Sequence, residues 1–167
     1  MRPILFVAAT ALLAIACAPQ AQARKLGSLD FKACSLSTPF SGTAIAAQCA
    51  VLQVPENPAA PAGRKIGLKI AWIPADRDDA AEPDPVFMLA GGPGQSATET
   101  YPQAASAFDE TRKKRHLILV DQRGTGGSNA LSCKEPFDES ELPTPQAASD
   151  YTKRCLASLS KRADPRF

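Results

Sequence analysis

The chain has 167 residues, of which 44% are hydrophobic and 22% charged, and its formal net charge is +2. This composition is typical of a globular protein with one modest core. Aromatic residues make up only 6% of the chain and no stacking motif occurs, which argues against a nucleic-acid-binding protein. We interpret the basic cluster Arg112-Lys113-Lys114-Arg115 as the solvated C-terminal end of a helix rather than as a contact for nucleic acid or an anionic surface.

The first 23 residues have the pattern of a secretory signal. Arg2 provides a positive start, Ile4–Ala18 is apolar, and Ala21-Gln22-Ala23 matches a small-x-small cleavage site. We therefore expect cleavage after Ala23 and export to the periplasm or the extracellular space. The apolar run is short for a membrane span and no stop-transfer pattern follows it, so no transmembrane helix is expected.

Five cysteines are present, and the first offers an alternative to soluble export. The segment Ala14-Ile15-Ala16-Cys17 loosely resembles a bacterial lipoprotein signal with Cys17 as the lipidated residue, but alanine stands where that signal prefers leucine. The other four cysteines favour two disulfides in an oxidising compartment. We expect the pairs Cys34–Cys49 and Cys133–Cys155, because each brackets a local segment. Metal binding is disfavoured, since no C-x-x-C occurs and the chain has a single histidine; no metal or organic cofactor is predicted.

Three strands are predicted in the first half of the mature chain. Thr43–Val54 suits a strand, and a proline-rich loop separates it from Lys65–Pro74. In this second segment apolar side chains alternate with small or polar ones, which is typical of a half-buried antiparallel strand. Val86–Ala90 is a continuous apolar run and predicts a strand covered on both faces.

A helix and a fourth strand follow. Thr100 is the expected N-terminal cap of a helix that extends to the basic cluster, and its apolar side chains recur at helical spacing at Tyr101, Ala104, Ala105 and Phe108. Leu117–Val120 predicts another buried strand. A strand, a helix and a strand in succession imply a right-handed parallel unit. The predicted fold class is therefore α/β, with an antiparallel start that leads into a parallel sheet.

The last third of the chain contains one more predicted element. Ser132–Pro143 is broken by prolines and is expected to be irregular. Thr144–Lys161 has the pattern of an amphipathic helix, capped by Thr144 and with Pro145 at its first position.

The glycine-rich segment Gly91-Gly92-Pro93-Gly94 admits several interpretations. A phosphate-binding loop would end in G-K-[ST], whereas Gln95 and Ser96 follow here, and the glycine spacing is not that of a dinucleotide fingerprint. A tight strand-to-helix turn is the structural alternative. The functional one is an oxyanion hole, since α/β-hydrolases place such a loop between their third strand and first helix. Glycine suits this role because a side chain would block the substrate carbonyl.

Two motifs together resemble a known family. The segments "LAGGPGQSA" and "LILVDQRGTGGS" resemble the paired signature of α/β-hydrolases related to prolyl and tripeptidyl aminopeptidases, which are serine peptidases that release residues from peptide N-termini. The first motif is similar to their HGGPG loop, with Ala90 where many members have histidine. The resemblance covers roughly Thr43 to Ser128. It implies the N-terminal portion of an α/β-hydrolase fold, with Gly92 as the oxyanion-hole glycine and Gly91 as the fallback.

The second motif resembles the family's D-Q-R-G-x-G-x-S pattern, and the matching residues are Asp121, Gln122, Arg123, Gly124, Gly126 and Ser128. We expect Asp121 and Arg123 to fix this turn through charge-assisted hydrogen bonds and so brace the glycine loop. Contact of Arg123 with substrate is the alternative. Ser128 is not expected to be a nucleophile, because Ala130 replaces the last glycine of G-x-S-x-G and no helix pattern follows.

The sequence lacks a catalytic triad. No G-x-S-x-G occurs, and His116 precedes a strand in mid-pattern, whereas the hydrolase base comes last; His116 is therefore interpreted as a structural or surface residue. Residues 24–167 are expected to be the N-terminal part of an exported serine hydrolase, truncated before its nucleophile and inactive alone, with peptides as substrates of the full-length protein. A lipase or esterase of the same fold and a non-catalytic, disulfide-stapled binding module remain alternatives. The oligomeric state stays open.

Overall fold

The computed structural model describes residues 24–38, 41–133, 144–164 and 166. The predicted signal segment, with Cys17 and the cleavage site, lies outside the described residues. The strands are β1 (Arg24–Leu26), β2 (Leu29–Thr38), β3 (Ser41–Pro55), β4 (Lys65–Ile73), β5 (Val86–Met88) and β6 (Leu117–Val120). The helical elements are η1 (Asp78–Ala80), α1 (Ala97–Ala104), η2 (Ala105–Phe108), α2 (Asp109–Arg112) and α3 (Pro145–Leu159).

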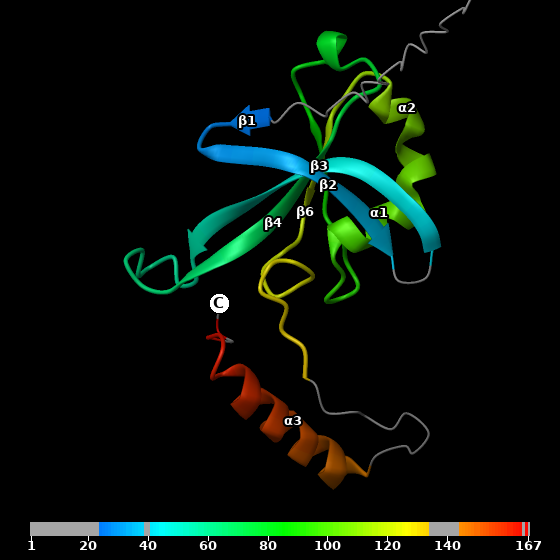
Figure 1. Ribbon diagram of the computed structural model, residues 1–167. Helices are drawn as coiled ribbons and strands as arrows, with labels where there is room; N and C mark the ends of the chain where they lie inside the picture. The colour runs from blue at the N-terminus through cyan, green and yellow to red at the C-terminus, as the bar shows by residue number, and fades with distance from the viewer. Residues whose placement is uncertain (1–23, 39–40, 134–143, 165, 167) are drawn as a thin grey trace, which may run out of the picture.

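The strands form one curled, mostly antiparallel sheet in the order β1-β2-β3-β4-β6-β5 (Figure 1). Only β5 and β6 pair in parallel, as the strand–helix–strand pattern predicts. The predicted fold class, an α/β-hydrolase-like parallel sheet, is nevertheless wrong. Strands β1 through β4 pair antiparallel with their neighbours in chain order, and the connections between them are too short for the crossover that a parallel pair needs. Strand β6 then pairs with β4 antiparallel, so one parallel pair is all that the described residues contain.

The β3–β4 hairpin agrees closely with the sequence prediction. Its register runs from Gln48 opposite Trp72 to Pro55 opposite Lys65, and the strand bounds lie within two residues of those expected. Strand β2 was not predicted. Its first half buries Phe31 on one face of the sheet, whereas its second half buries Leu36 on the other. The curl of the sheet causes this exchange, and it removes the uniform alternation by which a strand is recognised.

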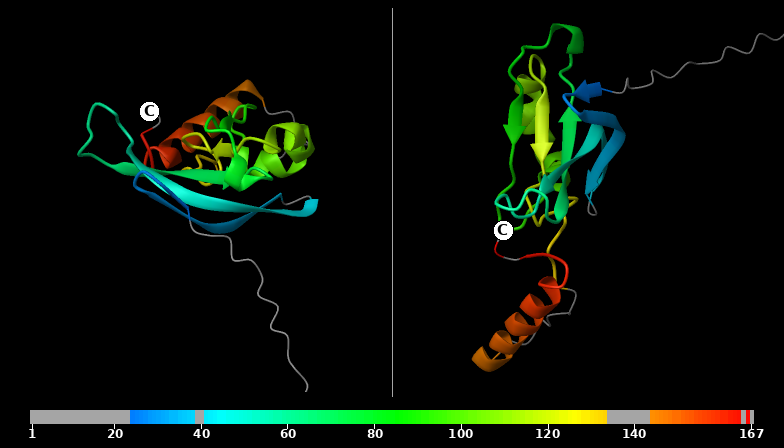
Figure 2. Two further views of the ribbon diagram at one scale, coloured as in Figure 1. Left: turned by 90° about the horizontal axis from the view of Figure 1, so that it is seen from above. Right: turned by 90° about the vertical axis from the view of Figure 1, so that its left-hand side faces the viewer.

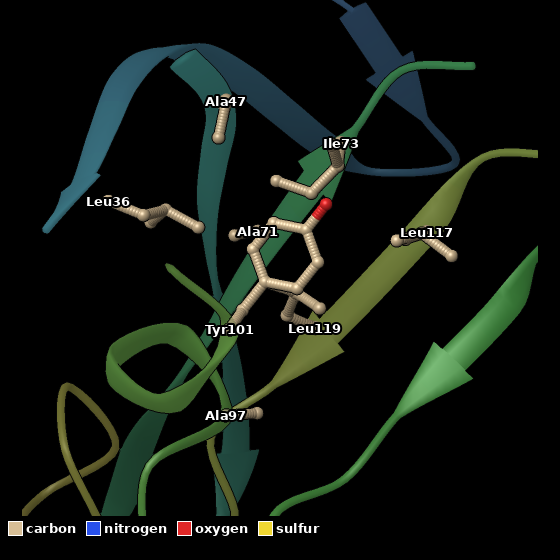
Figure 3. Packing of buried hydrophobic residues seen from close by; sticks show 8 residues of the cluster. All are labelled: Leu36, Ala47, Ala71, Ile73, Ala97, Tyr101, Leu117 and Leu119. Atoms are coloured by element: carbon tan, nitrogen blue, oxygen red, sulfur yellow. The ribbon is translucent and has the colours of Figure 1, made fainter. Parts of the chain in front are cut away.

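The main core lies between the sheet and α1. Tyr101 of α1 is fully buried and lies against side chains from β2, β3, β4 and β6 (Figure 3). The residues of this cluster are Leu36, Ala47, Ala71, Ile73, Ala97, Tyr101, Leu117 and Leu119. Figure 2 shows α1 and α2 on one side of the curled sheet.

The helix after the glycine loop starts earlier than expected and is interrupted. Its N-terminal cap is Ser96 rather than Thr100, and the Ser96 hydroxyl accepts a hydrogen bond from the backbone N–H of Glu99 at 3.1 Å. The predicted single helix is divided into α1, η2 and α2. It does reach Arg112, the first residue of the basic cluster.

Strand β5 is less buried than its apolar sequence predicts. The side chains of Phe87 and of Leu89, just after the strand, are 62% and 60% exposed, so the expectation that both faces are covered is wrong here. Strand β6 is buried at Leu117, Ile118 and Leu119, as predicted.

Helix α3 lies beyond the end of the sheet (Figures 1 and 2). Thr144 caps it by accepting a hydrogen bond from the N–H of Ala147 at 3.2 Å, and Pro145 is its first residue, both as predicted. The disulfide Cys133–Cys155 connects it to the segment after β6. The second disulfide, Cys34–Cys49, links β2 to β3. Both predicted pairings are confirmed, and their Cα atoms are 5.5 and 5.8 Å apart. Among the described helices, none has the length and apolar character needed to cross a bilayer.

Candidate functional site

The glycine loop Gly91–Gly94 follows β5 and leads into α1, so it sits at the carboxyl end of the parallel pair. Gly92 and Gly94 have φ angles of +129° and +87°, which favour glycine. The N–H of Gln95 donates to the carbonyl of Gly91 at 3.2 Å and closes the loop. All four residues are exposed.

The Gly92 N–H has no acceptor among the described residues. A Cβ at Gly92 would lie 2.9 Å from Cγ of Gln95, whereas at Gly91 it would meet nothing within 4 Å. A side chain at Gly92 is therefore opposed both by the positive φ and by Gln95, whereas at Gly94 the φ alone opposes it, and Gly92 offers a free donor to solvent. These are two properties that an oxyanion-hole residue needs.

A buried carboxylate fixes the start of α1. Asp121 follows β6 and is fully buried. Its Oδ1 accepts from the hydroxyl of Ser96 at 2.8 Å and from the N–H of Thr98 at 2.9 Å. Its Oδ2 accepts from the hydroxyl of Thr98 at 3.0 Å and from the N–H of Gly127 at 3.0 Å. The carboxylate thus joins the segment after the glycine loop to the second motif, and it lies at the positive end of α1.

The second motif folds into a turn that holds Asp121 in place through hydrogen bonds. Ser128 is fully buried; its hydroxyl donates to the carbonyl of Asp121 at 2.7 Å and accepts from the N–H of Lys69 at 2.8 Å. Gly124 closes the turn by donating its N–H to the carbonyl of Ser128 at 2.9 Å. Ser128 is inaccessible and its hydroxyl is engaged on both sides, which is incompatible with a nucleophile in this conformation.

Gly126 shows why this turn needs glycine beside the carboxylate. Its φ is +44°, and an added Cβ would lie 2.5 Å from Oγ of Ser96 and 2.6 Å from Oδ2 of Asp121. The backbone of the second motif therefore packs directly on the polar side chains that begin α1.

Arg123 contacts a different part of the chain from Asp121. Its guanidinium donates to the carbonyls of Pro55 and Glu56 at 3.1 and 3.0 Å, at the end of β3. Glu56 in turn accepts from the N–H of Asp164 at 2.9 Å and pairs with Arg64. The hydrogen bond from the Asp164 N–H lowers the pKa of the Glu56 carboxyl, and the contact with Arg64 lowers it further. Arg123 and Glu56 thus connect the second motif, the β3–β4 hairpin and the segment after α3.

His116 lies away from the glycine loop, at the start of β6. Its Nδ1 accepts a hydrogen bond from the N–H of Ala75 at 3.1 Å, and its ring meets the edge of Trp72 at 5.0 Å between centroids. Burial lowers the pKa of His116, and the nearby charge of Arg24 lowers it further. These contacts are those of a structural residue, as the sequence suggests.

Sequence reasoning found Asp121 and Gly92 but missed the partners of Asp121. Ser96 and Thr98 come from the start of α1, about 25 residues earlier in the chain. The stretch Ser96-Ala97-Thr98-Glu99 has the spacing of a capping box, which was the available signal for the first of them. Nothing in the sequence pointed to Glu56. No cluster of three or more potential metal ligands occurs in the described ranges.

Comparison with protein-family models found no match, and no curated protein matched the chain.

Proposed function

We propose that Gly91–Gly94 is the oxyanion-stabilising loop of an exported serine hydrolase, and that Gly92 is its donor. The observation that carries this proposal is the free, exposed N–H of Gly92, on a loop anchored within a few residues by the buried Asp121. A donor that is fixed before the reaction costs no reorganisation when negative charge develops on the substrate carbonyl oxygen. The proposal rests on this local geometry and does not require a parallel sheet.

We assign none of the described residues as nucleophile, acid or base, and we infer that these groups come from other parts of the enzyme. No G-x-S-x-G occurs in the sequence, Ser128 is buried, and His116 accepts from the backbone. In the proposed reaction, a serine attacks the substrate carbonyl and forms a tetrahedral oxyanion, which the Gly92 N–H stabilises before an acyl-enzyme forms. The chain of 167 residues is expected to be inactive by itself.

The motif resemblance favours a peptidase that releases residues from peptide N-termini over a lipase or esterase. Two disulfides in the predicted sequential pairing support an exported protein.

Activity-based labelling tests the proposal on the native protein. The exported fraction of producing cells is treated with a biotinylated fluorophosphonate, which reacts with the nucleophilic serine of serine hydrolases, and captured proteins are digested with trypsin. We expect the peptide Ile70–Arg77 among the captured proteins, and its loss after pretreatment with phenylmethylsulfonyl fluoride. Recovery of this peptide only from the unlabelled fraction would show that the native protein has no reactive serine, and the hydrolase proposal would be abandoned.

A substrate comparison then separates peptidase from esterase. The native enzyme is expected to cleave p-nitroanilides of peptides with a free N-terminus and to leave the N-acetylated forms of the same peptides intact. Hydrolysis of p-nitrophenyl esters alone would support an esterase instead.

A further inference from the structure

Gln95 carries the only polar side chain between the end of β5 and Ser96, the N-terminal cap of α1. It is exposed, like the glycines before it, and its carboxamide has no hydrogen-bond partner among the residues that the structure places. A carboxamide offers two N–H donors and one acceptor oxygen. These groups are therefore available to a bound molecule.

The Gln95 side chain lies against Gly92. A Cβ at Gly92 would be 2.9 Å from Cγ and 3.3 Å from Cδ of Gln95. Because the Cβ and the backbone nitrogen of one residue are about 2.5 Å apart, Cδ of Gln95 lies within about 6 Å of the Gly92 nitrogen. An oxygen that accepts two hydrogen bonds of about 2.9 Å can connect donors up to about 6 Å apart. The Gly92 N–H and the terminal amide of Gln95 can therefore reach the same oxygen.

Hydrogen bonds fix the backbone on both sides of Gln95. Its own N–H donates to the carbonyl of Gly91 at 3.2 Å, and the next residue, Ser96, is buried and donates to Asp121 at 2.8 Å. The Cα of Gln95 is therefore held relative to Gly92, and only the side-chain torsions remain to be ordered. A donor on a fixed backbone needs little reorganisation when charge develops on the substrate.

The neighbouring N–H groups in the first turn of α1 are already engaged within the protein. The N–H of Thr98 donates to Asp121 at 2.9 Å, and that of Glu99 donates to the hydroxyl of Ser96 at 3.1 Å. These two donors are not available to a substrate bound at the glycine loop, whereas the carboxamide of Gln95 is.

We propose that Nε2 of Gln95 is a second donor to the substrate oxyanion, beside the N–H of Gly92. This inference rests on the proposed function. When the serine oxygen bonds to the carbonyl carbon and its proton passes to the base, the π electrons move onto the carbonyl oxygen. A donor to that oxygen stabilises the transition state more than the bound substrate. Its loss should therefore lower kcat and leave KM almost unchanged.

Gln95→Leu in the full-length enzyme tests this role, because leucine is of similar size and has no donor. With a p-nitroanilide of a peptide with a free N-terminus, we expect kcat to fall about 10- to 100-fold and KM to change less than twofold. Gln103→Leu is the matched control at an exposed position of α1, and both constants should stay within twofold. An unchanged kcat for Gln95→Leu, or a rise in KM alone, would overturn the proposal.

Tetrahedral adducts distinguish a donor from a residue that only supports the loop. A peptide aldehyde forms a hemiacetal with a nucleophilic serine and places its oxygen in the oxyanion hole, whereas the matching peptide alcohol cannot. Gln95→Leu should weaken inhibition by the aldehyde by about the same factor as kcat/KM and leave inhibition by the alcohol within twofold. Equal weakening of both inhibitors would mean that the loop has moved, and the proposal would be abandoned.

Gln95→Glu adds a test of charge. A carboxylate would repel the oxyanion, so we expect its kcat at pH 8 to be at least as low as that of Gln95→Leu. A glutamate variant with the activity of the unchanged enzyme would contradict a donor at this position.

Fluorophosphonate labelling separates this inference from the proposed function. If the unchanged full-length enzyme is not labelled, the proposed function fails, and the role of Gln95 fails with it. If the enzyme is labelled and cleaves peptides, but Gln95→Leu behaves like Gln103→Leu, only the role of Gln95 is wrong. Labelling of the enzyme together with a selective loss of kcat in Gln95→Leu would support both.

Discussion

The two oxygens of Asp121 accept one backbone N–H each, from Thr98 at 2.9 Å and from Gly127 at 3.0 Å. The first N–H belongs to the opening turn of α1 and the second to the glycine turn after β6. One buried side chain therefore fixes two loops that are distant in sequence, and the position of the glycine loop depends on it.

Asp121→Asn tests this double contact. An amide has one oxygen, so in either orientation its NH₂ group faces a backbone N–H, either that of Thr98 or that of Gly127. We expect the free energy of unfolding to fall by about 2–4 kcal/mol, measured by urea denaturation. The matched control is Asp79→Asn at an exposed position, which should change it by less than about 0.5 kcal/mol. A small change for Asp121→Asn would mean that the carboxylate does not hold the two loops together.

Gly126→Ala tests the close approach of the second motif to the same network. The positive φ and the overlap with Ser96 and Asp121 both oppose a methyl group, so a loss of more than about 2 kcal/mol in unfolding free energy is expected. Gly91→Ala is the control, because its Cβ would meet nothing within 4 Å. Similar stability of the two variants would disprove the packing argument.

Gly92→Val concerns the proposed function and is made in the full-length enzyme. A bulky side chain beside the Gln95 side chain would displace the loop and misdirect the Gly92 N–H. Since loss of one oxyanion donor typically costs about 10²–10³ in kcat, we expect a fall of this size with little change in KM. Gly91→Ala should retain most of the activity. An unchanged kcat for Gly92→Val would remove Gly92 from the oxyanion hole.

Local patterns account for what the sequence predicted correctly. Period-two alternation placed β4, and short separations between cysteines placed both disulfides. The predicted start of α1 at Thr100 is too late, because the capping box that begins at Ser96 starts the helix four residues earlier. Strand β2 was not predicted because its first half buries one face and its second half buries the other. This change follows from the curl of the sheet, which a short stretch of sequence does not reveal.

The fold class and the contacts of the site depend on long-range strand pairing, which local sequence patterns do not reveal. The strand–helix–strand pattern correctly predicts the parallel β5–β6 pair, but it does not reveal that β6 pairs with β4 in the antiparallel sense. In the site, Asp121 was identified by its motif, but its contacts with Ser96 and Thr98 form only when the parallel pair brings the two loop ends together.

Removal of the Cys34–Cys49 disulfide is expected to destabilise the sheet. The bridge closes a loop of 15 residues between β2 and β3, for which chain entropy gives about 3 kcal/mol. The Cys34→Ala/Cys49→Ala double variant should therefore unfold at lower urea concentration, whereas the Cys133→Ala/Cys155→Ala variant should mainly increase proteolysis near α3. Peptide mapping without reductant checks the pairing. An unchanged midpoint for the first variant would show that the hairpin is stable without its bridge.

The single histidine allows a direct test of pH dependence. Burial lowers the pKa of His116 below its ordinary value of about 6.5, and the positive charge of Arg24 lowers it further. As the pH falls, the unfolded chain therefore binds a proton at His116 before the folded chain does. The contribution of His116 to the free energy of unfolding is fully present above about pH 6.5, and it is lost as the pH drops from there to the folded pKa. The C2 proton of His116 in NMR spectra should titrate below the value in urea-unfolded protein. Arg24→Gln should move the folded pKa partway back, and His116→Gln should remove this part of the pH dependence. A folded pKa at or above the unfolded value would show that the ring is solvated rather than enclosed by Trp72 and Arg24.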